Sequence, residues 1–490
     1  MTSRGTVGNF FFSLLGKLLV WLARQLARLI AWLLVQAVMH PRSTTTAGVT
    51  AASIAALGWH LCLTVAGAAF VSLSTWKAAH PESFGKTVTT WTRTWWHRWW
   101  IYRRQWAMVF TRCELTVQAG TDVFVPKLKG VRSTPWWDHL TVELPVGQSP
   151  KRYENEETAD ALRLAFKGER LVLKRLQPRL VELALMRRDP LLTVVSATPI
   201  PDSVEAIDWH RVPVGLDEFG QPYTVSLLGG HTAIAGSTGG GKAGLGWNVL
   251  RAVAPAIVAG LVRPVGIDPK LMELSQAREI FAPGDYVGLG TAETENDLAK
   301  ATLDFLQQLV GDMLAAKKAA AEAGLRDFRP TKDRPLTLVV IDELAPLLSI
   351  WPRSIRDKIE DALRLLLTQG RAVGFIVVGA IQEPTKDVFG LRDLFTRRLA
   401  LRLPTESHTE AALIEHAVDY GAACHQISET TPGLLFSLQD GAKSTVRARL
   451  GYVTADDIDE LVAYVESATK VVSLDTWTTG DEKRLVENVA

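Results

Sequence analysis

Glycines and one lysine gather in the run TAIAGSTGGGKAGLGW, from Thr232 to Trp247. A short apolar segment leads into the glycines, and a helical pattern follows them. Small residues allow successive backbone N–H groups to surround a phosphate, and the start of the next helix adds its positive dipole end. Lys242 would then reach the terminal phosphates of a nucleotide. The alternative is an ordinary loop between a strand and a helix.

Eight consecutive positions make up this predicted phosphate cradle, namely Gly236, Ser237, Thr238, Gly239, Gly240, Gly241, Lys242 and Ala243. The last position departs from the usual pattern. A serine or threonine hydroxyl normally meets Mg²⁺ there, whereas Ala243 has no hydroxyl and Gly244 offers no substitute. The sequence therefore predicts a site for ATP and Mg²⁺ in which one usual metal contact is missing.

Two adjacent carboxylates follow an apolar run about a hundred residues later, where Leu336 to Glu343 reads LTLVVIDE. A continuous apolar run of this length is typical of a buried parallel strand. In a P-loop ATPase, Asp342 would hold the water shell of Mg²⁺, and Glu343 would polarise the attacking water. The alternative is a strand that meets solvent at its acidic end.

A third apolar run, GFIVVGAIQ from Gly374 to Gln382, places an amide at the end of a strand. Taken alone, Gln382 is a loop residue with its amide in water. Its position after a third core strand favours a sensor of the γ-phosphate. Three strand ends thus supply the candidate chemistry of an α/β domain.

The distribution of charge separates two parts of the 490-residue chain, which is long enough for two or three domains. Of its 54 basic and 52 acidic residues, residues 1–112 contain twelve basic residues and a single acid, Glu82. The remainder is net negative. Overall charge therefore does not indicate nucleic-acid binding by this remainder, and any DNA contact must be local.

An uncharged stretch, residues 43–76, lies within the basic part. Residues 47–73 exceed the roughly 20 residues that a membrane-spanning helix needs, so we predict a transmembrane segment. Basic residues follow it and place the main part of the chain in the cytoplasm, beneath the plasma membrane. These basic residues are Lys77, Lys86, Arg93, Arg98, Arg103, Arg104 and Arg112.

An earlier apolar stretch, residues 9–39, contains Lys17, Arg24 and Arg28, which share one helical face. It either lies on the membrane surface as a basic amphipathic helix or spans as the partner of the second helix. We favour a spanning hairpin, so the anchor is single-pass or multi-pass. Further on, residues 91–106 alternate tryptophans with arginines and fit lipid headgroups or nucleic acid. Proximity to the membrane segment favours lipid.

The pattern between residues 113 and 203 indicates a small α/β domain without a catalytic constellation. Strands are expected at residues 140–144, 170–175 and 180–185, and a helix at residues 155–166. We interpret it as a spacer or an oligomerisation domain. The predicted organisation is a membrane anchor over residues 1–112, the small domain over 113–203, the motor over 204–467 and a polar tail over 468–490.

Several segments in order over residues 205–465 resemble the motor of the FtsK/SpoIIIE family of double-stranded DNA translocases. They are GSTGGGKAG, PVGIDPKLMEL, VVIDELAPLL, QGRAVGFIVVGAIQEP, LFTRRLALRL and VRARLGYVTADDI. The resemblance implies a RecA-like P-loop motor domain with a parallel central sheet. Two further phrases, RRDPL at residues 187–191 and ISETTPG at residues 427–433, resemble the FtsK-like conjugative transfer proteins of actinobacterial plasmids and integrative elements.

The resemblance also implies partners and further site residues. Proteins of that branch are membrane-anchored, form homo-hexameric rings and use ATP to move double-stranded DNA between mycelial cells. Arg371 and Arg398 match family arginines, and either would neutralise charge on the transferring phosphoryl group of a neighbouring subunit. The alternative for each arginine is a salt bridge within its own fold.

Two departures from the family affect substrate recognition and contacts between subunits. After Ser467 a short polar tail follows, so we expect no winged-helix module and no reading of DNA sequence. Glu410 stands where division-type motors often have an arginine. Two other functions remain open, namely a secretion ATPase that moves protein and a membrane scaffold that binds nucleotide without hydrolysing it.

Overall fold

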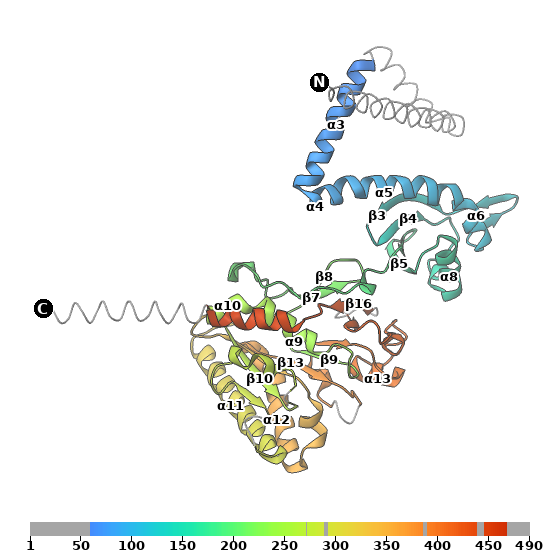
Figure 1. Cartoon of the computed structure of the whole chain (residues 1–490). Coiled ribbons are helices and arrows are strands. Elements are labelled where there is room, and N and C mark those ends of the chain that lie inside the picture. The colour runs from blue at the N-terminus through green and yellow to red at the C-terminus, as the bar shows by residue number, and fades with distance from the viewer. Residues whose placement is uncertain (1–58, 271, 289–292, 386–389, 439–444, 468–490) are drawn as a thin grey trace, which may run out of the picture. The chain divides into compact units, whose positions relative to one another are not determined.

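The computed structural model describes residues 59–270, 272–288, 293–385, 390–438 and 445–467 (Figure 1). The chain divides into two compact units. One consists of Met1–Gln105 with Val131–Thr134, and the other consists of Trp106–Gly130 with Pro135–Ala490. The predicted helix at residues 9–39, the first part of the predicted transmembrane segment and the polar tail lie outside the described residues.

The described part of the first unit is helical except for Val131–Thr134, which contains the end of strand β3 (Lys127–Ser133). Its α-helices and two π-helical turns run nearly without interruption, as α3 (Trp59–Ala79), α4 (Pro81–Phe84), η1 (Gly85–Thr89), α5 (Thr90–Trp96) and η2 (His97–Arg103). The Trp76 indole donates a hydrogen bond to Ser83 Oγ at 2.7 Å across the short break after α3. Among the helices described, none combines the length and the apolar character needed to cross a bilayer.

The second unit begins with a small α/β part that confirms the predicted secondary structure. A four-stranded sheet has the order β3-β4-β6-β5. Its strands are β3 (Lys127–Ser133), β4 (Trp137–Glu143), β5 (Arg170–Gln177) and β6 (Leu180–Met186). Helix α8 (Glu156–Ala165) begins at Asn155, whose side chain accepts a hydrogen bond from Glu157 N at 3.2 Å. The domain boundaries at residues 112, 203 and 467 stay predictions.

Helix α6 (Arg104–Arg112) packs on this small part through one apolar face. Trp106 and Phe110 are buried and stack with ring centroids 4.2 Å apart, and both rings lie near Phe166. The sequence did not indicate this role for the end of the aromatic segment, because the interleaved arginines obscure the helical period.

A ten-stranded sheet forms the centre of the motor, in the order β11-β10-β12-β13-β9-β14-β15-β16-β7-β8. The strands from β11 to β14 in that order are parallel, and the others pair antiparallel. The strands are β7 (Val212–Asp217), β8 (Pro222–Val225), β9 (Thr232–Ala235), β10 (Val262–Asp268), β11 (Tyr286–Gly288), β12 (Leu336–Ile341), β13 (Phe375–Ile381), β14 (Arg397–Ala400), β15 (Leu434–Leu438) and β16 (Thr445–Leu450).

This mixed sheet corrects the predicted parallel sheet. The prediction is right for the half that contains β9, β12 and β13, and it is wrong for the half from β15 to β8. The physical reason is connection length: β15 and β16 are separated by only residues 439–444, and β7 and β8 by a tight turn. Connections as short as these join antiparallel neighbours, whereas parallel neighbours need a crossover of a dozen or more residues.

Helices cover both faces of the motor sheet (Figure 1). Along β12, Leu338 and Val340 belong to one apolar core, and Val339 and Ile341 belong to the other. The first core includes residues of α9 (Ala243–Ala252) and α10 (Ala254–Val258), and the second includes residues of α11 (Glu295–Glu322) and α12 (Arg353–Gln369). Apolar side chains cover both faces of the central strands, which explains why β12 and β13 are almost entirely apolar. The candidate polar residues of these strands therefore lie at their ends.

The carboxyl ends of β9, β10, β12 and β13 meet at one edge of the sheet, since these four strands are parallel neighbours. In parallel α/β sheets this edge is where ligands bind. The glycine-rich turn follows β9, the acidic pair follows β12, and Gln382 follows β13. The fold thus brings together three segments that are far apart in the sequence.

Candidate active site

The glycine-rich turn between β9 and α9 depends on glycine at two positions with left-handed backbone. Gly239 has φ +74° and Gly241 has φ +91°, where other residues are strained. A Cβ on Gly241 would also lie 2.8 Å from the backbone nitrogen of Gly433. The same nitrogen donates a hydrogen bond to Gly240 O at 2.9 Å. The turn is therefore held from outside by a second loop.

Lys242 ends the turn, and its ammonium group folds back over it. Nζ donates hydrogen bonds to Gly236 O at 2.8 Å and Ser237 O at 3.2 Å. Burial lowers the pKa of Lys242, and the nearby Glu343 carboxylate partly opposes that shift. A terminal phosphate would offer this ammonium stronger acceptors than two neutral carbonyls do.

Glu343 is almost completely enclosed, with 1% of its surface exposed. Its Oε1 accepts hydrogen bonds from the backbone nitrogens of Gln382 at 3.1 Å and Ala345 at 3.3 Å. Its Oε2 lies 3.4 Å from Lys270 Nζ. In this arrangement protein donors hold both oxygens of the carboxylate.

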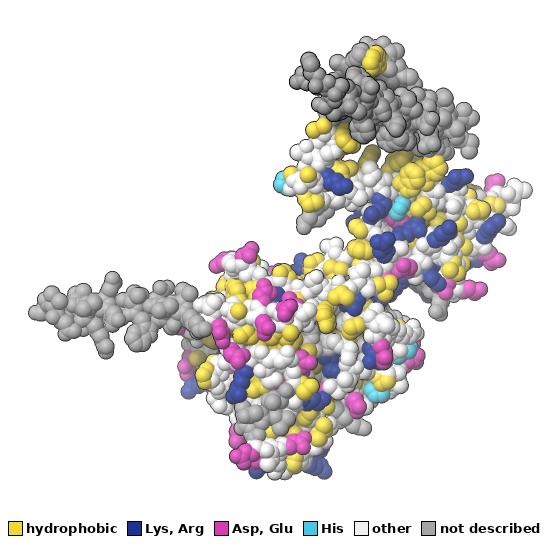
Figure 2. All heavy atoms as spheres, viewed as in Figure 1, with side chains coloured by type: hydrophobic (Ala, Val, Ile, Leu, Met, Phe, Trp, Pro, Cys, Tyr) yellow, Lys and Arg dark blue, Asp and Glu magenta, His cyan; other side chains and the backbone are white. Residues whose placement is uncertain are grey.

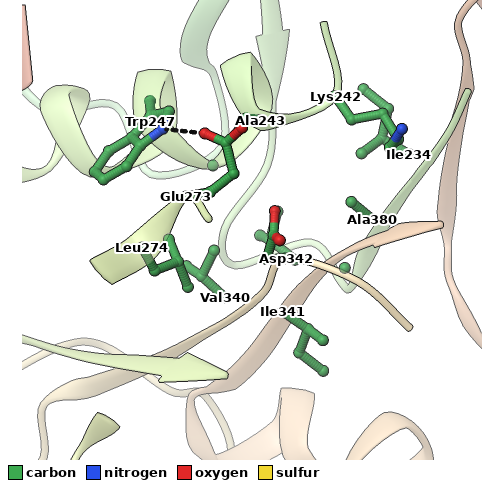
Figure 3. Close-up of a pocket in the computed structure, with 13 residues that line it drawn as sticks. Ile234, Lys242, Ala243, Trp247, Glu273, Leu274, Val340, Ile341, Asp342 and Ala380 are labelled. Atoms are coloured by element: carbon green, nitrogen blue, oxygen red, sulfur yellow. Dashed lines mark hydrogen bonds between the residues drawn. The ribbon is translucent and has the colours of Figure 1, made fainter. Parts of the chain in front are cut away.

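Asp342 points into a small pocket beside the turn (Figure 3). Ala243, Trp247 and Glu273 line the same pocket, and Trp247 Nε1 donates to Glu273 Oε2 at 3.5 Å. Burial raises the pKa of Asp342 to about 7, with further contributions from the carboxylates of Asp268, Glu273 and Glu343. The four acidic side chains in and around this pocket therefore outnumber the two nearby lysines, Lys242 and Lys270.

Gln382 connects the turn to the acidic pair. Its Oε1 accepts a hydrogen bond from Thr238 Oγ1 at 3.4 Å, and its backbone nitrogen donates to Glu343. Contacts therefore run from the tip of the turn through Gln382 to Glu343 and Lys270. The structure brings together Lys242, Asp342, Glu343 and Gln382, as the sequence predicted; their roles stay predictions.

The two predicted arginines lie away from this edge. Arg371 belongs to the turn Gly370–Val373, directly before β13, and is exposed. Arg398 lies near the start of β14, where its NH1 is 2.7 Å from Asp393 Oδ1. Both therefore lie toward the amino-terminal ends of the parallel strands. Neither is part of the cradle formed by its own chain.

Other residues at the site were not assigned a role from the sequence. Lys270 and Glu273 follow β10, next to β12, and only the position of the phrase DPK after a strand could have indicated them. Arg402 donates to Thr238 O at 3.2 Å and lies 2.8 Å from Glu429 Oε1. Arg402 lies within the segment LFTRRLALRL, but the segment does not indicate its contact, which depends on the pairing of β14 with β9.

The donors at this edge fit Mg²⁺ in their chemistry, since that ion prefers carboxylate and phosphate oxygens. Asp342 and Glu273 are the carboxylates that line the pocket. Within the part of the chain that the structure describes, no three acidic, histidine or cysteine side chains converge as a metal cage. Mg²⁺ at nucleotide sites is bound by one or two carboxylates together with phosphates and water.

No protein-family model matches the chain. In sequence the chain is similar to DNA translocase FtsK 1 of Neisseria meningitidis, with 25% identity over 328 residues, which is 62% of this chain and 38% of that protein. DNA translocase SftA of Bacillus subtilis is 26% identical over 52% of this chain and 26% of that protein. DNA translocase FtsK of Mycobacterium tuberculosis is 28% identical over 47% and 28%. The chain thus matches well under half the length of these relatives. The predicted resemblance to FtsK/SpoIIIE translocases is confirmed.

Among solved structures, the pCW3 conjugation coupling protein TcpA, a monomer form with ATPγS, aligns with 73% of this chain and 98% of its own length. Its sequence identity is 17% and its TM-score is 0.44. The cytoplasmic domain of the type VII secretion ATPase EccC of Thermomonospora curvata aligns with 56% and 33%, at 19% identity and a TM-score of 0.41. These scores are too low to define a shared architecture. The P-loop ATPase-like fold rests on the mixed sheet and its turn.

Proposed function

We propose that this FtsK/SpoIIIE-like chain is an ATPase that translocates double-stranded DNA. One observation carries the proposal: Lys242, the pair Asp342 and Glu343, and Gln382 converge at one edge of the sheet although they come from three separate segments. The sequence relatives are named as DNA translocases. Phosphate-backbone contacts in such a motor do not depend on DNA sequence.

In the proposed mechanism the turn binds the phosphates of ATP. The backbone N–H groups of Gly236, Ser237 and Gly240 already donate within the protein. The other N–H groups of the turn and the start of α9 would face the phosphate oxygens, and Lys242 would exchange its two carbonyl contacts for the terminal phosphate. Asp342 would hold Mg²⁺, with Glu273 near the place where Ala243 lacks a hydroxyl. When bound, Mg²⁺ neutralises charge on the phosphates.

Glu343 would act as the base in hydrolysis. It takes a proton from the attacking water while the bond between the γ-phosphorus and the bridging oxygen breaks. To do so it exchanges its contact with Lys270 for one with water. Gln382 would sense the γ-phosphate, because its amide already contacts Thr238 in the turn. Loss of the phosphate would then change the position of both segments.

A ring of six chains would complete the site. Since Arg371 and Arg398 lie toward the opposite edge of the sheet, they would act on ATP bound by a neighbouring subunit, where such an arginine is worth roughly 10³ to 10⁵ in rate. Mixing two inactive variants, Lys242→Ala and Arg398→Ala, tests this geometry, with Arg371→Ala in a parallel mixture. Recovered hydrolysis in a mixture supports a shared site. If neither mixture recovers activity, the assignment of these arginines fails.

The experiment that tests the proposed function is ATP hydrolysis by the full chain with and without linear duplex DNA. We expect duplex DNA to increase turnover, and Glu343→Gln to abolish it. Stimulation by a protein substrate instead of DNA would favour a secretion motor. ATP binding without turnover would favour a non-hydrolysing scaffold. Either of these results would contradict the proposal.

Membrane attachment and conjugative transfer belong to the same proposal. Residues 43–76 carry no charge, and exposed tryptophans follow them, including Trp91, Trp95 and Trp99. Arg103 lies over the Trp99 ring at 4.2 Å, and Figure 2 shows apolar and basic side chains side by side around α5. These features fit the headgroup region of the plasma membrane, with the motor in the cytoplasm.

The phrases RRDPL and ISETTPG support the conjugative branch. Plasmid transfer between mycelial cells that carry the wild-type chain or the Glu343→Gln variant tests that assignment. Cosedimentation of the full chain with anionic and with neutral vesicles tests the attachment. We expect transfer to require Glu343, and binding to increase with anionic lipid. Transfer that is independent of Glu343 would contradict the conjugative role, and failure to bind either vesicle would contradict the attachment.

A further inference from the structure

The loop that ends at Gly433 contacts the glycine-rich turn, residues 236–243, which we call the phosphate turn. Gly433 N donates to Gly240 O at 2.9 Å, and Gly433 O accepts from Leu450 N at 2.9 Å. Gly433 has φ +82°, and Gly241 lies too close to it for a side chain. Pro432 immediately precedes this contact. We call Pro432–Gly433 the clamp, because it fixes one side of the turn to the motor sheet.

One buried arginine fixes the clamp. Arg449 on β16 is 4% exposed. Its Nε donates to Pro432 O at 3.0 Å, and its NH1 donates to Leu191 O at 2.9 Å and Thr193 O at 3.0 Å. Three backbone carbonyls from two distant segments thus share one guanidinium. A lysine in this place could not reach them in the same forked geometry.

The second of these segments, Asp189–Thr193, connects the small sheet to the motor, and we call it the strap. Leu191 is completely buried in the motor core. Asp189 N donates to Glu169 Oε2 at 3.0 Å, next to strand β5, and Asp189 Oδ2 lies 2.8 Å from Arg447 NH2. The strap therefore contacts both parts of the second unit, and Arg449 hydrogen-bonds both the strap and the clamp.

We propose that Arg449 is a positioning residue that couples the strap to the phosphate turn. It holds Pro432 and the strap in one arrangement, so that ATP binding at the turn orders the strap, and displacement of the strap weakens ATP binding. The two effects are equal in size by linkage. This inference rests on the proposed ATP site, and it assigns the small part a role in regulating that site.

Binding of the fluorescent nucleotide mant-ATP to the full chain tests the coupling. Arg449→Ala removes three hydrogen bonds, and we expect its Kd to rise about tenfold or more, with Arg449→Lys in between. Arg447→Ala is the matched control, since Arg447 lies on the same strand and contacts the strap but not the clamp. We expect its Kd to rise less than that of Arg449→Ala, because Arg449 still holds the strap to the clamp in this variant.

A second readout separates positioning from general loss of structure. In wild type, ATPγS should slow hydrogen exchange in residues 189–193, far from the phosphates. In Arg449→Lys this protection should be lost while the melting temperature stays near that of Arg447→Ala. If Arg449→Lys keeps wild-type affinity and protection, or if Arg447→Ala weakens binding as much as Arg449→Ala, the coupling is wrong. Failure of wild type to bind mant-ATP would instead contradict the proposed ATP site.

Discussion

Two regions of the second unit can be compared by the partners of their enclosed acidic side chains. Where the small part meets the motor, and within the small part, each acid faces an arginine. These pairs are Arg170 with Glu218 at 2.5 Å, Arg187 with Asp138 at 2.7 Å and Arg447 with Asp189 at 2.8 Å. We call the carboxyl-terminal edge of the parallel strands, with Lys242, Asp342, Glu343 and Gln382, the phosphate edge. There Asp342 has three other carboxylates among its neighbours, and burial together with these carboxylates raises its pKa to about 7.

This difference in partners distinguishes acids that stabilise the fold from acids that would bind a ligand. A buried acid that is paired and hydrogen-bonded needs nothing more, and removing its partner is destabilising. A group of acids with too few neighbouring cations destabilises the free protein, because the carboxylates repel one another. The binding of a cation relieves this repulsion. Strongly shifted pKa values of this kind cluster at functional sites. The arginine pairs thus stabilise the fold, and the excess of acids at the phosphate edge fits the proposed binding of ATP with Mg²⁺.

The largest expected effect is at the phosphate edge. Lys242→Ala removes the ammonium that would meet the terminal phosphate, and we expect ATP hydrolysis to fall about 10³-fold. Steady-state turnover measures it. Lys318→Ala is the matched control, because Lys318 is exposed on α11 with 79% of its side chain in solvent. Equal turnover in the two variants would contradict the proposed role of Lys242, and with it the difference between the two regions.

The same chemical change should have opposite signs in the two regions. Asp138→Asn breaks a pair in which Asp138 is completely buried, and we expect the free energy of unfolding to fall by about 3 kcal/mol. Asp342→Asn removes an ionisation that is unfavourable above the unfolded-state pKa, so the free protein should gain about 2 kcal/mol at pH 8. Urea unfolding measures both. Destabilisation by both variants would show that the two regions do not differ.

His231, a buried histidine at the amino-terminal ends of the parallel strands, provides a third environment for a titratable side chain. His231 is 1% exposed and accepts a hydrogen bond from Val377 N at 3.0 Å, and burial lowers its pKa to about 4. Below pH 6.5 the unfolded chain binds the proton and the folded chain does not, so stability falls as pH drops from 6.5 to 4 and is about 2 kcal/mol lower at pH 5.

His231→Asn keeps an acceptor for Val377 N and cannot titrate. Urea unfolding of wild type and variant at pH 5 and pH 8 isolates the contribution of His231 from that of the carboxylates. We expect a smaller loss of stability on acidification in the variant. The same pH dependence in both proteins would mean that His231 is protonated while the protein is folded.

The smallest expected effect concerns the missing hydroxyl. Ala243→Ser restores an oxygen at the start of α9, beside the pocket that Asp342 and Glu273 line. We expect the Mg²⁺ concentration needed for nucleotide binding to fall by about threefold, as one extra oxygen ligand would provide. A titration of Mg²⁺ with mant-ATP measures it. An unchanged midpoint would show that the neighbouring carboxylates already compensate.

The sequence predicted that the strand ends at the phosphate edge converge, because the signals for each strand are local; the roles of their residues stay predictions. Each apolar run ends in a polar residue, and the runs that end at Asp342 and Gln382 became β12 and β13 within one or two residues at each end. Parallel strands then bring such ends to one edge. Knowledge of the strand order was not needed for that inference.

The antiparallel half of the sheet and the clamp were not predictable in the same way. An apolar run shows that a strand is buried on both faces, but it does not show which strand lies beside it. The contact between Gly433 and Gly240, and those between Arg449 and the strap, join segments about 190 and 260 residues apart. They depend on pairing and register, which no local pattern contains.

The most direct test of the central claim is calorimetric titration of the full chain with ATPγS. If ATP binds at the phosphate edge, ATPγS should bind wild type in the presence of Mg²⁺. Binding should be at least about tenfold weaker when Mg²⁺ is chelated or when Lys242 is replaced by alanine. Absence of binding by wild type, or equal affinity in the Lys242→Ala variant, would contradict it.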